Sequence, residues 1–162
     1  MPIYDDDKTI AEIDIRGRFL MMACDIEWTM LHIMMLCSPD PMSQVRRFNS
    51  NEMRMHNKIQ CTICDLKKYK PDYYEEYKDE LEKLWEFKEV RNDVSHLKLF
   101  FEKDTDFKVF KFLQIKDGSN GMEQLFYKPY TIDQLNDYLG KFIDLNMSLL
   151  KLVDRLERDR TP

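Results

Sequence analysis

Apolar residues recur every three or four positions along most of the chain, which is the spacing of one buried helix face. This pattern predicts long helices over about residues 9–37, 50–69, 73–97 and 132–156. Between the last two helices the pattern changes to the alternation that is typical of strands. The chain is therefore predicted to be mainly α, a helical bundle of about four long helices with a β-hairpin inserted before the last helix.

Polar residues at the ends of these segments supply start and stop signals. Thr9 and Glu12 fit a capping box for the first helix, and Ser38-Pro39-Asp40-Pro41 ends it. The second helix is expected to begin near Asn49 or Ser50. Asp72 is expected to cap the third helix, and Thr131-Ile132-Asp133-Gln134 forms a second capping box before the last one.

The predicted hairpin lies within an insertion of about residues 98–128. Residues 108–115 are rich in β-branched and aromatic side chains, and residues 122–127 form a second short strand. Residues 117–121, Asp-Gly-Ser-Asn-Gly, are a turn cluster between the two.

Length and composition are those of a single domain spanning residues 1–162, since 43% of the 162 residues are apolar. The acidic N-terminus is unlike a signal peptide, and the apolar run Phe19–Cys37 is broken by Asp25, Glu27 and His32. With no export signal, the four cysteines are expected to be reduced thiols. These features predict a soluble, cytoplasmic protein with no membrane association.

The charge is distributed unevenly along the chain. Residues 43–70 hold seven basic and two acidic side chains, a net charge of +5 within a chain of net charge −5. One interpretation is a solvated basic helix face. The other is a face that contacts phosphate groups, since local charge matters more than net charge for that purpose. The candidate binding residues are Arg46, Arg47, Arg54 and Lys58.

Metal and cofactor signatures are weak in this sequence. Cys61-Thr62-Ile63-Cys64 is a lone CxxC, whereas a structural zinc site needs four ligands, usually from two such pairs. We interpret these cysteines as two small apolar thiols on a helix. No glycine-rich phosphate loop, nucleophile elbow or HExxH motif occurs. We therefore expect no metal and no cofactor.

The end of the third predicted helix has two distinct faces. On a helical wheel centred on Val94, the apolar residues Phe87, Val90 and Leu97 cluster around Val94 as a core stripe. Three residues lie on the opposite face, at roughly 160–200°: Trp85, Asn92 and His96. An outward histidine beside a large outward aromatic predicts that a partner covers this face. The alternative is a histidine that merely caps the helix C-terminus.

The segment Arg91-Asn92-Asp93-Val94-Ser95-His96 resembles the R-x4-6-H motif of HEPN domains, in its Arg-Asn-x-x-x-His form. HEPN domains are small helical bundles, and many of them are metal-independent endoribonucleases of toxin–antitoxin, phage-defence and RNA-processing systems. The resemblance implies that Arg91 and His96 form a catalytic pair that Asn92 orients. It also implies a homodimer in which two motifs face each other, with Trp85 at the interface.

Two positions depart from common forms of the motif. Lys98 stands where some toxin branches have a tyrosine, and Leu97 stands where many active members have a small residue.

Three functional hypotheses follow. The first is a homodimeric HEPN-like endoribonuclease with an RNA substrate and a possible antitoxin partner. The second keeps the fold but is a non-catalytic nucleotide-binding, RNA-binding or protein-interaction module. In the third, the motif in this helical bundle is accidental.

Overall fold

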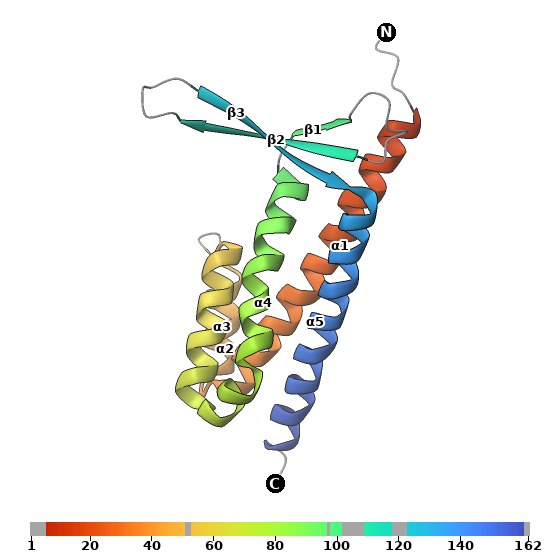
Figure 1. Ribbon diagram of the computed structural model, residues 1–162. Coiled ribbons are helices and arrows are strands. Elements are labelled where there is room, and N and C mark those ends of the chain that lie inside the picture. The colour runs from red at the N-terminus through yellow and green to blue at the C-terminus, as the bar shows by residue number, and fades with distance from the viewer. Residues whose placement is uncertain (1–5, 51–52, 97, 102–108, 118–122, 161–162) are drawn as a thin grey trace. The chain divides into compact units, whose positions relative to one another are not determined.

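A computed structural model describes residues 6–50, 53–96, 98–101, 109–117 and 123–160. In chain order the elements are α1 (Asp6–Cys37), α2 (Pro41–Phe48), α3 (Met55–Tyr69), α4 (Pro71–His96), β1 (Lys98–Phe101), β2 (Val109–Asp117), β3 (Glu123–Thr131) and α5 (Ile132–Arg158) (Figure 1). The prediction of a mainly α helical bundle with a hairpin before the last helix is confirmed.

Two predicted helix starts are wrong by a few residues. Helix α1 already includes Asp6, so Thr9 lies inside the helix and not at its cap. Helix α4 begins at Pro71, which places Asp72 in its first turn. Proline is well suited to this first helical position, because its fixed φ angle is helical and its missing N–H would have no helical partner there.

An additional short helix, which was not predicted, precedes the second predicted helix, and that helix itself begins later than expected. Helix α2 occupies Pro41–Phe48, and its cap is Asp40, whose side chain accepts a hydrogen bond from the Ser43 amide at 3.1 Å. Helix α3 begins at Met55 and not near Asn49 or Ser50. The signal for α2 was present in the sequence, because an Asp-Pro pair supplies both an N-cap and a first-turn proline.

The insertion before α5 forms an antiparallel sheet of order β1-β2-β3. Strand β1 was not predicted, and it pairs with the first half of β2. Strand β3 extends through Pro129 to Thr131, opposite Lys111 and Val109. Proline is tolerated there because β3 lies at the edge of the sheet among the described strands. The predicted turn residues 118–121 lie outside the described residues.

Helix α5 begins with the capping box that the sequence predicted. The Thr131 amide donates to Gln134 Oε1 at 2.8 Å, and the Gln134 amide donates to Thr131 Oγ1 at 3.1 Å. These reciprocal bonds satisfy two amide donors that have no partner within the helix, and they fix the passage from β3 into α5.

The chain divides into two compact units. The first unit comprises Met1–Met21 and Val90–Lys141, and the second comprises Met22–Glu89 and Phe142–Pro162. Helices α1, α4 and α5 contribute residues to both units. Among the residues whose burial is described, the buried apolar residues of the first unit are Ile15, Phe19, Val90, Val94, Leu135 and Leu139.

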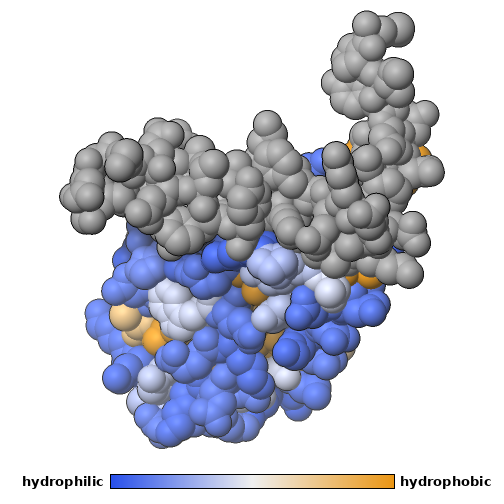
Figure 2. All heavy atoms as spheres, turned by 45° about the horizontal axis from the view of Figure 1, so that its top comes forward, coloured by the Kyte–Doolittle hydropathy of each residue, from blue (hydrophilic) through white to orange (hydrophobic). Residues whose placement is uncertain are grey.

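The described residues of the second unit form helices and short connections between them. Phe87 and Phe142 pack edge to face with their ring centroids 5.0 Å apart. The Thr29 hydroxyl donates to Asn146 Oδ1 at 2.8 Å and so satisfies a buried polar group. Figure 2 shows a largely hydrophilic surface over the coloured residues, with hydrophobic side chains in small separate patches.

Helix α1 carries the most apolar long segment among the described residues. Its segment Ile10–Cys37 is long and apolar enough to cross a membrane by length and composition, and 44% of its most apolar stretch is buried. The core helix of a globular protein meets the same criteria. The expectation of no membrane association therefore stays a prediction.

The second unit contains a buried carboxyl group, Asp65 on α3. Asp65 is 9% exposed, and its Oδ2 atom has no hydrogen-bond partner among the described residues. Burial raises the pKa of Asp65, while the nearby Arg47 and Lys68 act in the opposite direction. The folded state therefore binds this proton more tightly than the unfolded state. The stabilisation is present at low pH and is lost as the pH rises through the raised pKa.

Because the raised pKa means that the charged form of Asp65 destabilises the folded state, Asp65→Asn is expected to be more stable than the parent protein at pH 7. We expect a gain of about 1 kcal/mol, which corresponds to about 2–4 °C in melting temperature for a chain of this size. The gain should shrink as the pH is lowered towards 4, because the parent protein then carries the neutral acid itself. Thermal melts at both pH values measure it, with Asp144→Asn, at an exposed position inside α5, as the matched control. A loss of stability at pH 7 would mean that attraction to Arg47 outweighs the cost of burial.

Candidate functional site

The motif Arg91–His96 forms the C-terminal turns of α4 in the first unit. Arg91 Nη1 donates a hydrogen bond to Asn92 Oδ1 at 3.1 Å, and both side chains are partly exposed. Helical geometry extends to His96, so positions 92 and 96 are one turn apart on the same helix face. The helix therefore presents the Asn92 amide, which holds the Arg91 guanidinium, one turn before the position of a histidine.

Asp93, inside the motif, is a functional-site residue that the sequence reasoning missed. Only 6% of the surface of Asp93 is exposed to solvent. The carboxylate accepts hydrogen bonds from Lys128 Nζ at 3.0 and 2.9 Å and from the Tyr130 hydroxyl at 2.8 Å. These three residues tie the end of α4 to β3.

The sequence predicts only part of this cluster of Asp93, Lys128 and Tyr130, which is called the Asp93 cluster below. Lys128 and Tyr130 are two residues apart, so they point to the same face of a strand. A buried carboxylate needs a cationic partner and hydrogen-bond donors. Nothing local in the sequence shows that this face of β3 meets Asp93.

Arg16 on α1 is a second missed residue. Its Nη1 donates to the main-chain carbonyl of Val94, and its Nε donates to Glu12 Oε1 at 2.7 Å. The last four carbonyls of a helix have no partner within it, and a cation near that end is also favoured by the helix dipole. Arg16 therefore stabilises the last turn of α4 and adds a second guanidinium beside the motif.

The predicted core stripe of α4 is confirmed where it is described. Phe87, Val90 and Val94 are buried, and Leu97 lies outside the described residues. Trp85 belongs to the second unit, where its ring lies 5.0 Å from the ring of His56 and 5.6 Å from Lys88 Nζ. Residues of the same chain therefore cover part of Trp85, and its place in a dimer interface stays a prediction.

The four basic candidates also belong to the second unit. Arg46 and Arg47 are exposed in the last turn of α2, and Arg54 is exposed at the N-cap of α3. Lys58 is different, because it is partly buried, forms an ion pair with Glu27 and lies 4.5 Å from the centre of the Phe48 ring. Lys58 thus has a structural role, which makes it less available for phosphate than the exposed Arg46 and Arg54.

The two buried cysteines, Cys37 and Cys61, do not have the properties of reactive thiols. Burial raises the pKa of Cys37 to about 12 and also raises the pKa of Cys61. Both thiols are therefore protonated at neutral pH, whereas the thiolate is the nucleophile and the metal ligand. Across the described part of the chain, no three histidine, cysteine or acidic side chains lie close enough together to hold a metal ion.

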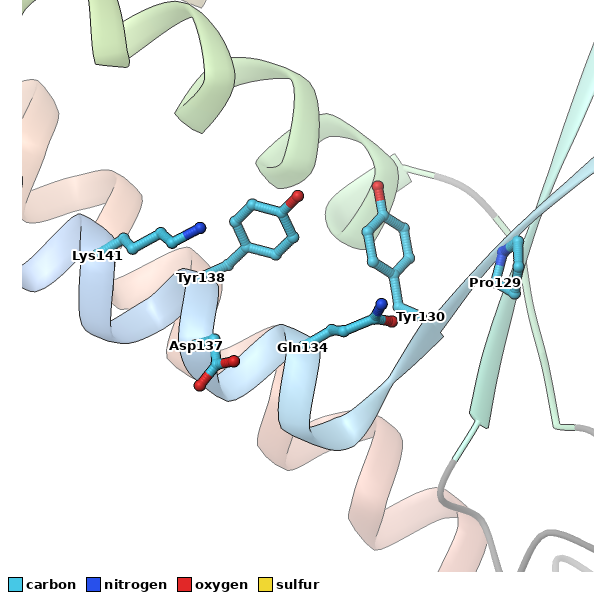
Figure 3. Close-up of a pocket in the computed structure, with 6 residues that line it drawn as sticks. All are labelled: Pro129, Tyr130, Gln134, Asp137, Tyr138 and Lys141. Carbon is cyan, nitrogen blue, oxygen red and sulfur yellow. The ribbon is translucent and has the colours of Figure 1, made fainter.

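A small open pocket lies next to the motif in the first unit. Its volume is about 200 Å³, and it is lined by Pro129, Tyr130, Gln134, Asp137, Tyr138 and Lys141 (Figure 3). Tyr130 and Tyr138 are arranged edge to face with ring centroids 6.3 Å apart. Lys141 Nζ lies 5.1 Å from the centre of the Tyr138 ring. Because Tyr130 also binds Asp93, one wall of this pocket is bonded directly to the motif.

The contacts of the Asp93 cluster lead us to expect large effects of substitutions on the free energy of unfolding. Lys128→Met should destabilise the protein by about 1.5–3 kcal/mol, because it leaves a buried carboxylate with the Tyr130 hydroxyl but without its cation. Asp93→Asn should cost less, because the ammonium that it leaves behind is 40% exposed and can be hydrated. The double variant should be more stable than Lys128→Met alone. Urea unfolding of the four proteins gives the coupling energy between the two sites.

Additive effects in that cycle would contradict a direct interaction between Asp93 and Lys128. Lys141→Met is a suitable control, because Lys141 is an exposed lysine of the same unit that makes no described contact with Asp93.

Comparison of the chain with protein-family models, with curated proteins and with solved structures gives no match in any of the three. The identification of this site therefore rests on the residues and the geometry described above.

Proposed function

We propose that this protein is a homodimeric, metal-independent endoribonuclease of the HEPN type, with Arg91 and His96 as its catalytic pair. The observation that carries the proposal is the Arg91–Asn92 pair at the end of α4, one helical turn before His96. The anchoring of the intervening Asp93 supports it, because catalytic groups need rigid support.

The chemistry is a transesterification followed by release of the 5′ fragment. A histidine base removes the proton of a ribose 2′-hydroxyl, and the 2′-oxygen attacks the adjacent phosphorus. The bond from phosphorus to the 5′-oxygen breaks, and that oxygen takes a proton from an acid. The products are a 2′,3′-cyclic phosphate and a free 5′-hydroxyl. The Arg91 guanidinium stabilises the charge that accumulates on the phosphorane, since its planar fork matches two phosphate oxygens.

A homodimer completes this scheme. Each chain contributes one motif, so two copies provide one histidine as the base and a second as the acid. A dimer also accounts for large apolar side chains that are exposed on α1: Ile10, Ile13, Leu20 and Met21. A cytoplasmic location and control by an antitoxin protein are parts of the same proposal.

A non-catalytic RNA-binding or nucleotide-binding module is the second candidate. The pocket beside the motif favours it, because an aromatic, lysine-containing pocket binds nucleotides whether or not the motif cuts them. Cleavage assays separate the two candidates.

We expect the purified protein to cut RNA in EDTA and to leave DNA intact, because DNA lacks the attacking hydroxyl. His96→Ala should abolish cleavage with little change in melting temperature, because the helical wheel places position 96 away from the buried stripe. Gel analysis of labelled RNA, with identification of the cyclic phosphate end, measures both effects. If a broad panel of RNAs stays intact, or if His96→Ala cuts as fast as the parent protein, the binding-module candidate replaces the nuclease.

The arginine variants give a graded test. Arg91→Ala should slow cleavage on the order of 100-fold, like the loss of a transition-state charge donor. Arg91→Lys should recover only part of the rate, because a point charge cannot form two parallel hydrogen bonds to phosphate. Arg18→Ala is the matched control, since Arg18 is an exposed arginine paired with Asp14 on α1. Full rescue by lysine would contradict bidentate phosphate binding.

The dimer is testable without any substrate. Light scattering at micromolar concentration should give twice the mass of the chain. Hydrogen exchange should show protection over the C-terminal half of α4, including the segment with Trp85. A monomer, or an interface formed only by the β2–β3 hairpin, would contradict the arrangement that the nuclease mechanism requires.

A further inference from the structure

The pocket formed by the end of β3 and the first turns of α5 has no part in the chemistry proposed above. Figure 3 shows the rings of Tyr130 and Tyr138 on the same side, with their hydroxyls pointing the same way and Lys141 reaching back towards Tyr138. Asp137 points away from the two rings. The pocket therefore combines two aromatic walls with one cation on one side.

The size and lining of the pocket restrict its ligand. A volume of about 200 Å³ is below the roughly 300–1,000 Å³ of sites for drug-sized ligands, so it suits one planar ring system. An aliphatic ligand would desolvate the Gln134, Asp137 and Lys141 side chains without compensation. A nucleobase has a π-face for a tyrosine ring, polar edges for an amide and an attached phosphate for a lysine.

We propose that Tyr138, Lys141 and Gln134 form a subsite for one unpaired nucleotide of single-stranded RNA, an inference that rests on the proposed function. The base stacks on the Tyr138 ring, and the Lys141 ammonium binds the phosphate of the same nucleotide. Lys141 is exposed and has a flexible stem, so it can exchange its place over the ring for that phosphate.

Gln134 adds a polar contact to the base. Its Oε1 atom is used in the capping box with the Thr131 amide, which leaves the side-chain NH₂ group to donate to a base oxygen or nitrogen. Tyr130 closes the other side and is bonded to Asp93 of the motif. The subsite is thereby linked to the same turns of α4 that carry Arg91 and Asn92, and in the proposal it positions a nucleotide that flanks the cleaved phosphate.

Binding of a short single-stranded RNA that is 2′-O-methylated throughout tests this proposal, because that RNA cannot be cleaved. Fluorescence anisotropy should show that Tyr138→Ala binds about 5- to 150-fold more weakly, the range expected for the loss of one stacked base. Tyr138→Phe should bind nearly as well as the parent protein, because it keeps the ring. Lys141→Ala should weaken binding and reduce the slope of log affinity against log salt by about one.

Tyr74→Ala is the matched control, because Lys67 lies over the Tyr74 ring at 5.3 Å but Tyr74 does not line the pocket. It should leave binding unchanged. Melting temperatures of all variants show whether each has folded. If Tyr138→Ala has not folded, Lys141→Ala still tests the subsite, because an unchanged salt dependence in that variant would contradict the proposal.

Three results would overturn the subsite: no binding of the modified RNA by the parent protein, unchanged binding by a folded Tyr138→Ala, or equal losses in the Phe and Ala variants. The subsite and the nuclease fail separately. Cleavage of ordinary RNA together with unchanged binding by Tyr138→Ala would remove only the subsite. Binding that depends on Tyr138 without any cleavage would remove only the nuclease.

Discussion

The hydrogen-bonded ion pair between Asp93 on α4 and Lys128 on β3 is the interaction on which the candidate site depends. A carboxylate that is 6% exposed is costly unless it is neutralised and hydrogen bonded, and Lys128 and Tyr130 do both. Because the partners must meet with defined geometry, the cluster allows few positions of β3 against the last turns of α4. Arg91 and Asn92, which are partly exposed and precede Asp93 on the same helix turn, are thereby held in a defined position.

The end of a helix is otherwise a poor place for catalytic groups, because its last turn has unpaired carbonyls and frays. Arg16 counters this by donating to the Val94 carbonyl while Glu12 holds its guanidinium. The motif is therefore supported from two directions within the first unit, by α1 and by β3. This support leaves Arg91 partly exposed to a ligand while its backbone is held.

Tyr130 belongs both to the hydrogen-bonded cluster around Asp93 and to the pocket at the start of α5. Its hydroxyl completes the Asp93 cluster, and its ring forms one wall of the pocket at the start of α5. A ligand that stacks in the pocket therefore contacts a residue that is bonded to the motif. The basic candidates of α2 and α3 belong to the second unit, and one of them, Lys58, forms an ion pair with Glu27.

The sequence by itself determined the features that depend on neighbours within one or two helical turns. The apolar spacing predicted the long helices, the buried stripe through Val90 and Val94, and the capping box of Thr131 and Gln134. Local reasoning could also have found α2 from Asp40-Pro41. Only the tertiary structure decided that Asp93 meets Lys128, 35 residues away, and that Arg16 meets Val94, 78 residues away. Such pairs arise when separate elements pack together, and periodicity records which face of an element is buried but not what it is buried against.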